Sequence, residues 1–134
     1  MDVYPYFPYL FDPKQVPLEY ENCEQHNLKF TNPNGLMYTN FLDQQLDAVI
    51  VAMRKLGYDN IKLTIAETGC PNTDELSQLG ANINYVSLYN RRIIRRMLAN
   101  PPPGTPCRPN QFIPTYIFEL CDEGQKPRPE TERH

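Results

Sequence analysis

The chain has 134 residues, a length that suits one small domain with its own core and does not suffice for two. Its net charge of −3 gives no electrostatic basis for binding nucleic acid or an anionic membrane. No apolar run approaches the roughly 18 residues of a membrane-spanning helix, and the first residues lack the basic and apolar regions of a signal peptide. As written, the sequence predicts a soluble protein made in the cytosol, with no nucleic-acid partner and no membrane span.

The cysteines favour neither a metal site nor a particular disulfide. They are widely spaced, no C-x-x-C pair occurs, and only two histidines, His26 and His134, are available as companions. Three pairings are possible in principle, and free or partly buried thiols are the preferred interpretation. We therefore expect neither a metal nor a cofactor. The four positions are Cys23, Cys70, Cys107 and Cys121.

The N-terminal stretch over residues 3–11 is aromatic and is interrupted by Pro5 and Pro8. A central strand cannot carry two prolines, so we expect the first few residues to pair in a sheet and the remainder to form a loop. Tyrosines at such a junction can stack on the C–H face of a pyranose, although ordinary core and rim aromatics are at least as good an interpretation. Residues 12–35 show no lasting period and predict a long loop.

A helix and a strand follow. Apolar residues at spacings of three and four predict a helix over residues 36–56, with Gly57 as its C-terminal stop. An alternating, β-branched run then predicts a strand over residues 61–67, which stops at a glycine–proline turn over residues 68–71. Glu67 lies at the end of this strand, held by the sheet yet facing whatever lies beyond it.

A second helix is expected over residues 81–98, followed by a proline-rich linker and a last strand over residues 112–121. The predicted buried stripe of this helix comprises Ile83, Val86, Ile93, Ile94, Met97 and Leu98. Four arginines fall outside the stripe, which favours a solvated helix face over a basic patch; they are Arg91, Arg92, Arg95 and Arg96. The last strand runs into an acidic cluster with one lysine, residues 122–126.

The resulting order is strand, helix, strand, helix, strand. Strands joined through helices lie parallel, so their carboxyl ends point the same way. This arrangement brings the aromatic residues 4–9, Glu67 and the cluster at 122–126 to one rim. Two carboxyl groups and sugar-holding aromatic rings on one rim are the outline of a glycosidase site. Taken alone, Glu67 is equally well read as a surface residue that ends a strand.

Several motifs in one order carry a resemblance that covers nearly the whole chain. They are Val3-Tyr-Pro-Tyr-Phe7, Ala66-Glu-Thr-Gly-Cys-Pro-Asn72, Gly104-Thr-Pro-Cys-Arg-Pro109, and Tyr116-Ile-Phe-Glu-Leu-Cys-Asp-Glu-Gly-Gln-Lys126 with Glu130-Thr-Glu-Arg-His134. Together they resemble the C-terminal part of plant endo-1,3-β-glucanases, glycoside hydrolase family 17. The resemblance implies an α/β fold, a partial (β/α)8 TIM barrel with about strands six to eight and the intervening helices. Residues 1–134 would then be a C-terminal fragment of the catalytic domain.

The resemblance also implies an activity and a set of site residues. The activity is retaining hydrolysis of β-1,3-glucan, in a parent family that is secreted to the cell wall. Glu67 matches the catalytic nucleophile, which must be ionised and rigid, and a nearby lysine keeps the pKa of such a group low. Matched substrate-binding positions are Tyr4, Tyr6, Glu123, Lys126 and Glu132. For Lys126 and Glu132 a surface ion pair is an equally good interpretation.

Two departures from the family pattern bear on activity. The family usually has tryptophan where this chain has Cys70, which puts sugar contacts or packing beside the nucleophile in doubt. The general acid of a retaining pair lies about 5 Å from the nucleophile, and in this family it follows the fourth strand, which is not in this sequence. Two hypotheses result: the chain is glucan endo-1,3-β-glucosidase material, or it is an inactive fragment that at most binds glucan weakly. A full barrel needs at least about 200 residues, so we expect the isolated polypeptide to turn over no glucan.

Overall fold

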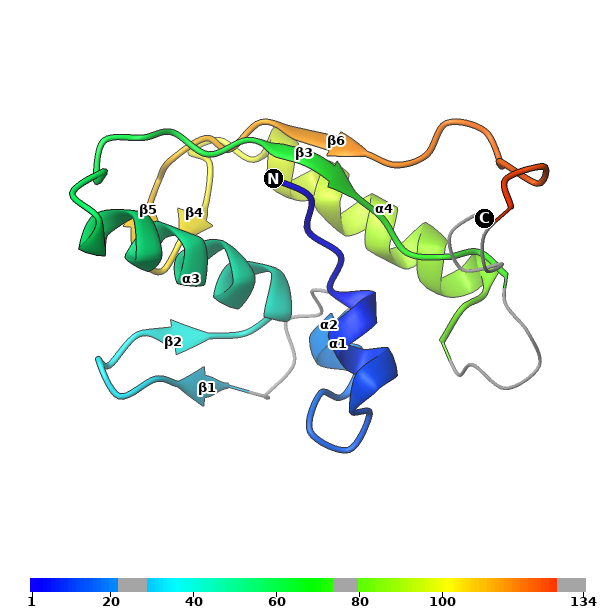
Figure 1. Ribbon diagram of the computed structural model, residues 1–134, viewed down its shortest axis with the longest axis horizontal. Helices are drawn as coiled ribbons and strands as arrows, with labels where there is room; N and C mark the ends of the chain where they lie inside the picture. The colour runs from blue at the N-terminus through cyan, green and yellow to red at the C-terminus, as the bar shows by residue number, and fades with distance from the viewer. Residues whose placement is uncertain (22–28, 74–79, 128–134) are drawn as a thin grey trace.

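A small parallel sheet organises the residues that the structure describes, 1–21, 29–73 and 80–127 of a computed structural model. Its central strand, β3 (Ile65–Thr68), pairs in parallel with β6 (Thr115–Ile117). On the other side of β3 the N-terminal residues also run parallel, with a bridge between Asp2 and Glu67. The Val3 amide donates to the Glu67 carbonyl at 2.9 Å. The predicted parallel order of three extended segments is thus confirmed (Figure 1).

Both named strands are shorter than predicted. The expected strands span residues 61–67 and 112–121, whereas the ladder is confined to β3 and β6 and its register shifts within β3. Glu67 is therefore the penultimate residue of its strand rather than the last. The side chains nevertheless alternate over a longer stretch, since Leu63 and Ile65 are buried while Thr64 and Ala66 are exposed. The sequence period reports which face is buried, and it continues where strand pairing has already stopped.

Residues 6–38 contain more regular structure than the predicted loop. Two short helices form there, α1 (Tyr6–Phe11) and α2 (Leu18–Glu21). Pro8 is compatible with α1 because it lies in the first turn, where its missing N–H has no helical acceptor. Further along, β1 (Phe30–Thr31) and β2 (Met37–Tyr38) pair as an antiparallel hairpin. The prediction of a loop was therefore wrong for α1, α2 and β1, and the predicted helix over residues 36–56 was wrong for β2.

The helix α3 (Phe41–Lys55) begins later than the predicted residue 36. Asn40 sets its start, because the Asn40 side chain accepts a hydrogen bond from the Asp43 amide and so caps the helix. The predicted stop is confirmed, since Gly57 adopts a φ of +86° directly beyond the helix. The apolar face of α3 packs into the core, which lies between the sheet and helices α1, α3 and α4; its buried members include Tyr6, Tyr9, Leu42, Leu46, Ile50, Ile65 and Ile93.

The helix α4 (Ile83–Leu98) covers one face of the sheet, but its buried stripe is not the predicted one (Figure 1). Ile83, Ile94 and Leu98 were expected inside and are 64, 48 and 78% exposed. The fully buried positions are Tyr89 and Ile93, four residues apart. Tyr89 is drawn inward because its hydroxyl hydrogen-bonds Thr68 Oγ1 at 2.5 Å, a partner on β3 that the periodicity of the helix does not reveal.

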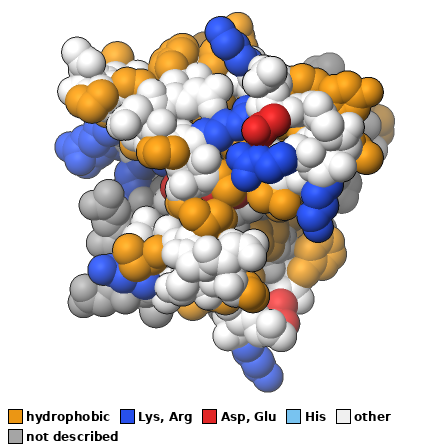
Figure 2. Space-filling model, turned by 90° about the vertical axis from the view of Figure 1, so that its left-hand side faces the viewer, with side chains coloured by type: hydrophobic (Ala, Val, Ile, Leu, Met, Phe, Trp, Pro, Cys, Tyr) orange, Lys and Arg blue, Asp and Glu red, His pale blue; other side chains and the backbone are white. Residues whose placement is uncertain are grey.

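Large apolar side chains also lie on the surface of the described part of the chain. Leu120, Phe11 and Leu98 are 98, 84 and 78% exposed. On the face shown in Figure 2, hydrophobic side chains form several groups separated by basic and polar ones. A red acidic side chain lies against two blue basic ones near the top of that view, so the basic groups on this face are interspersed with other kinds rather than gathered into one field.

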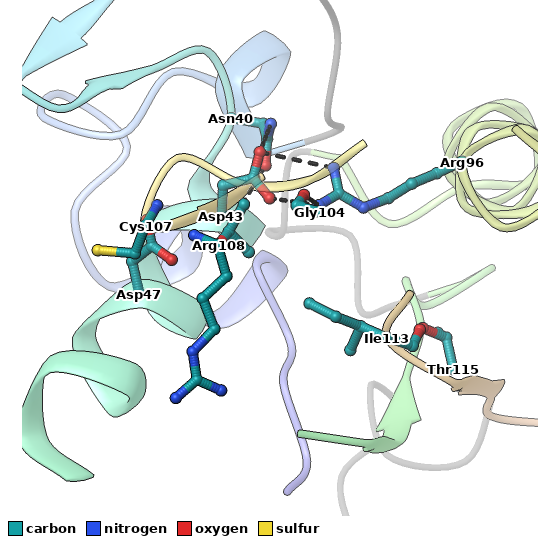
Figure 3. Close-up of polar contacts among 10 residues, drawn as sticks. Asn40, Asp43, Asp47, Arg96, Gly104, Cys107, Arg108, Ile113 and Thr115 are labelled. Carbon is teal, nitrogen blue, oxygen red and sulfur yellow. Dashed lines mark hydrogen bonds and ion pairs between the residues drawn. The ribbon is translucent and has the colours of Figure 1, made fainter. Parts of the chain in front are cut away.

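A buried ion pair joins the two long helices, and it corrects the prediction that all four arginines of α4 lie on a solvated face. The Arg96 guanidinium reaches Asp43 of α3 at 2.6 Å, and the two side chains are only 17 and 11% exposed (Figure 3). Arg96 also donates to the Gly104 carbonyl, and Asn40 donates to the second Asp43 oxygen at 2.8 Å. Arg91 and Arg95 are exposed, as predicted. The partner of Arg96 lies 53 residues away, so the helical pattern could not indicate it.

A hairpin that begins in the predicted proline-rich linker, residues 100–106, and extends beyond it docks on the same face of α3. It consists of β4 (Gly104–Thr105) and β5 (Arg108–Pro109), which pair antiparallel. The backbone amide of Cys107 at its tip donates to Asp47 of α3 at 2.9 Å (Figure 3). Arg108 donates to the Ile61 carbonyl at 2.7 Å, which ties the hairpin to the approach of β3. The linker thus holds α3 and the sheet together instead of merely connecting α4 to β6.

Candidate active site

A cavity of about 440 Å³ lies at the carboxyl ends of the three parallel segments. Its walls come from the stretch after the N-terminal segment, the end of β3, the loop after β6 and one side of α4. Sheets of this kind build their ligand sites at this edge, because the loops that follow the strands converge there. The residues that line the cavity include Tyr4, Tyr6, Phe7, Glu67, Cys70, Asn90, Phe118, Glu119, Asp122 and Lys126.

Glu67 and Tyr4 form a direct hydrogen bond at the wall of this cavity. The Tyr4 hydroxyl donates to Glu67 Oε2 at 2.9 Å. Burial raises the pKa of Tyr4 above its usual 10, and the bond to Glu67 and the nearby carboxylate charges raise it further. The phenol therefore stays protonated and remains a donor. The backbone of Glu67 is fixed as well, through its carbonyl bond to Val3. A half-buried carboxylate is thus held by both its backbone and its side chain.

The aromatic residues at the cavity differ in how much surface they offer. Tyr6 is 1% exposed and belongs to the core, with its ring 6.0 Å from that of Tyr9 and 6.3 Å from that of Phe7. Tyr4 is half-buried, and its ring lies 5.7 Å from the Phe7 ring in an edge-on arrangement. Tyr6 therefore acts mainly as packing for the wall, whereas Tyr4 presents its hydroxyl at the site.

The loop after β6 brings Lys126 to the cavity but leaves Glu123 outside its lining. Lys126 pairs with the exposed Glu123, and its Nζ lies 5.3 Å from the centroid of the Phe118 ring. The carboxylates that do line the cavity from this loop are Glu119 and Asp122. Glu132, the remaining matched position, lies outside the described residues.

Sequence reasoning missed several lining residues. Glu119 lies two residues beyond β6, but the predicted strand continued to residue 121, so the sequence did not place it at a carboxyl end; Asp122 lay within the predicted acidic cluster but was not singled out. Asp122 accepts a hydrogen bond from Asn72 Nδ2 at 3.0 Å, which links the loop after β3 to the loop after β6. Asn90 and Val86 line the cavity from α4, and no local pattern could indicate them, because their placement depends on how the helix is rotated against the sheet.

The cysteines of the described residues include one at the wall of the cavity. Cys107 and Cys121 are free thiols, while Cys23 lies outside the described ranges. Cys70 is 7% exposed and lines the cavity beside Glu67.

In the ranges that the structure covers, no three His, Cys, Asp or Glu side chains are grouped so that they could hold a metal ion. None of the helices described is long and apolar enough to cross a membrane.

A sequence profile described as glycosyl hydrolases family 17 matches residues 1–134. The chain belongs to this family. The family resemblance inferred from the motifs is thereby confirmed. Curated relatives agree: the chain is 44% identical, over its whole length, to the probable glucan endo-1,3-beta-glucosidase A6 of Arabidopsis thaliana. It is 37% identical, over 98% of its length, to a glucan endo-1,3-beta-glucosidase of Triticum aestivum. It covers 28 and 27% of these two proteins.

Solved structures of family 17 proteins match the fold closely. CJP38, a β-1,3-glucanase and allergen of Cryptomeria japonica pollen, superposes with a TM-score of 0.86 at 38% identity. The match covers 99% of this chain and 39% of the pollen protein. A plant β-glucan endohydrolase, from a pair described as having distinct substrate specificities, matches with a TM-score of 0.84 at 26% identity, over 98% of this chain and 40% of that one. This family 17 chain therefore spans well under half the length of the relatives it matches.

Proposed function

We propose that this chain supplies the nucleophile and one wall of the substrate cleft of a retaining glucan endo-1,3-β-glucosidase. Its three parallel segments would be the sixth, seventh and eighth strands of a (β/α)8 barrel, of which residues 1–134 are the C-terminal part. The parallel order of the sheet and the match of the whole chain to about two fifths of longer β-glucanases support this assignment. The single observation that carries the proposal is the Tyr4–Glu67 hydrogen bond at the wall of the cavity.

Glu67 has the surroundings that a glycosidase nucleophile needs. Such a residue attacks the anomeric carbon and forms a covalent glycosyl-enzyme, which water then hydrolyses. The attack requires a carboxylate that stays in one place, because a displacement of about 1 Å can lower the rate roughly 100-fold. The Tyr4 hydroxyl at 2.9 Å fixes one oxygen, and the pairing of the Glu67 backbone fixes its position along the cleft.

The other cavity residues suit a neutral polysaccharide. Phe118 and Phe7 offer apolar surface to the C–H faces of sugar rings, and Asp122 and Glu119 offer acceptors to hydroxyl groups. Lys126 supplies a positive charge near the carboxylates of the cavity, with Glu123 as its partner and Glu132 as a further proposed contributor. The names of the relatives support β-1,3-glucan as the substrate, a cell-wall polysaccharide, and hence action outside the cell.

A laminarin assay on a chimera tests this proposal. The chain would replace the matching 39% of the pollen β-1,3-glucanase, and reducing ends released from laminarin would be measured. We expect the chimera to hydrolyse laminarin and Glu67→Gln to lower kcat by at least about 1,000-fold, because the nucleophile is removed. Asp59→Asn, a change at an exposed carboxylate that is not part of the cavity lining, serves as the control and should retain activity. A glutamine variant as fast as the unaltered chimera would refute the role of Glu67.

The 134-residue chain alone should release no reducing ends from laminarin. The family resemblance assigns the general acid to a strand outside these residues, and the match to only 39 and 40% of the solved glucanases agrees with a missing wall. The alternative function of the isolated chain is weak glucan binding without turnover. Robust hydrolysis by the isolated chain that is lost in Glu67→Gln would overturn this expectation and make Glu119 or Asp122 the candidate acid.

A further inference from the structure

The helix α4 contributes a polar side chain to the cavity that no catalytic role accounts for. Asn90 lines the same cavity as Glu67, and Val86, one turn earlier on α4, lines it too. In Figure 1 α4 runs alongside β3 and β6, so these residues form the part of the wall nearest the helix layer. Cys70, with its short side chain, lines the cavity as well. The site therefore extends from Glu67 to the helix layer.

The side-chain oxygen of Asn90 lacks a hydrogen-bond partner within the described residues. This atom, Oδ1, is shielded from solvent and accepts no hydrogen bond there. Leaving a buried acceptor unpaired is unfavourable, and native proteins retain few such groups without a use for them. The neighbouring residue on the helix behaves differently, since the Tyr89 hydroxyl is paired with Thr68 Oγ1. The Asn90 side chain thus lines the cavity while its oxygen, shielded in this rotamer, has no protein partner, whereas the Tyr89 hydroxyl is paired in the core.

We infer that Asn90 is a saccharide-binding residue that pairs with a hydroxyl group of a glucan ring seated beside Glu67. This inference rests on the function proposed above. An amide presents one acceptor and two donors, and a sugar hydroxyl can both donate and accept, so the two groups match in either orientation. The amide can turn over about its last bond without losing a protein hydrogen bond, because its oxygen makes none with the described residues. Val86, one turn before Asn90 on α4, presents an apolar side chain to the same cavity, and less polar surroundings strengthen a hydrogen bond formed there.

Binding of laminaritetraose to the chimera tests the inference. The chimera would carry Glu67→Gln so that the oligosaccharide is not consumed, and affinity would be measured by calorimetry. We expect Asn90→Leu to weaken binding about 3- to 10-fold, the effect of one hydrogen bond. The Asn90 side-chain NH2 signals, identified by their loss in the variant, should shift when the oligosaccharide is added. The matched control is Asn84→Leu, an asparagine on the exposed side of the same helix, and it should leave the affinity unchanged.

Asn90→Ala provides a second variant in case leucine disturbs the packing of α4. If a folded Asn90 variant binds with unchanged affinity, and the Asn90 NH2 signals do not shift in the unaltered chimera, the role of Asn90 is refuted. The proposed function would still stand in that case, provided that the catalytic chimera hydrolyses laminarin. A chimera that neither hydrolyses laminarin nor binds the tetrasaccharide would overturn both. Equal weakening by Asn90→Leu and Asn84→Leu would also refute the inference, because it would indicate a general effect on the helix.

Discussion

Single side chains decide what the cavity can do, and Tyr4 illustrates how. The hydroxyl of Tyr4 bonds the proposed nucleophile, while its ring packs edge-on against Phe7. Among the described residues, no other side chain hydrogen-bonds the Glu67 carboxylate. The orientation of that carboxylate within the cavity therefore depends on one donor. Because burial and the carboxylate together raise the pKa of Tyr4, this donor persists over the whole pH range in which a glycosidase works.

Tyr4→Phe should lower kcat of the chimera about 10- to 100-fold with little change in KM. The substitution removes the hydroxyl but keeps the ring and its packing, so the loss reflects the freed carboxylate rather than a collapsed wall. Laminarin kinetics measure the effect. Tyr85→Phe, at a partly buried tyrosine of α4 that does not line the cavity, is the matched control. A Tyr4→Phe variant with unchanged kcat would indicate that the sheet alone fixes Glu67.

The thiols also differ residue by residue. Burial raises the pKa of Cys107, and the charge of Asp47 and a hydrogen bond to it raise the pKa further, whereas Cys121 is exposed. The raised pKa keeps the Cys107 thiol largely protonated at pH 7.5, and Cys121 is exposed, so we expect Cys121 to be alkylated first and the reaction of Cys107 to speed up as the pH rises. Peptide mapping after timed iodoacetamide treatment would measure the order. Faster modification of Cys107 at neutral pH would contradict this arrangement of the hairpin.

At this scale the sequence located part of the site. Glu67 and Lys126 could be identified from the sequence, because each belongs to a family motif at or after a predicted strand. Both line the cavity. Tyr6 and Glu123 were identified in the same way, through the family motifs. Tyr6 is almost wholly in the core, however, and Glu123 lies outside the cavity lining. Asn90 could not be found, because an asparagine within a helix acquires a role only when tertiary packing turns it toward a cavity.

Among the elements, the two long helices are connected by charge as well as by apolar packing. Asp43 of α3 and Arg96 of α4 are nearly buried, and the β4–β5 hairpin hydrogen-bonds both Arg96 and Asp47 (Figure 3). Helix periodicity assigned Arg96 to solvent because a helical pattern reports only which side is apolar. It contains no information on a carboxylate that another helix presents. The hairpin was missed for a related reason, since four residues of ladder in a proline-rich stretch leave no periodic signal.

Asp43→Ala should lower the free energy of unfolding by about 3 kcal/mol, because it leaves a largely buried guanidinium without its counter-charge. This is the low end of the range for buried pairs, since the two side chains keep 11 and 17% exposure. Urea unfolding of the chain, followed by circular dichroism, measures the change. The matched control is Arg54→Ala, whose pair with Asp59 is 48 and 58% exposed and should contribute nothing measurable. Equal midpoints for both variants would mean that the buried pair adds no stability.

At the scale of the whole molecule, the described part of the chain leaves many large apolar side chains exposed to solvent. The parallel order and the helical cover were predictable, because strand–helix alternation leaves few other arrangements. Three parallel strands without the rest of a barrel expose strand edges and an apolar face. The exposed side chains are distributed over several of the described elements, including α1, both strands of the β1–β2 hairpin, α4 and the loop after β6, and hydrophobic groups appear on the face in Figure 2. Their individual identities were not predictable, since Ile83, Ile94 and Leu98 were assigned to the core.

This surface leads to a prediction about association. The 134-residue chain should bind the dye ANS and should elute earlier from a sizing column as its concentration rises, because large exposed apolar side chains and unpaired strand edges favour self-association. The chimera should remain monomeric and bind little dye, since in the proposed barrel the remainder of the domain would cover the open face of the sheet. Leu98→Glu, at a position 78% exposed on α4, should reduce both effects in the isolated chain without lowering its helix content. A monomeric, dye-free chain at about 100 μM would mean that the exposed side chains are too dispersed to act as one surface.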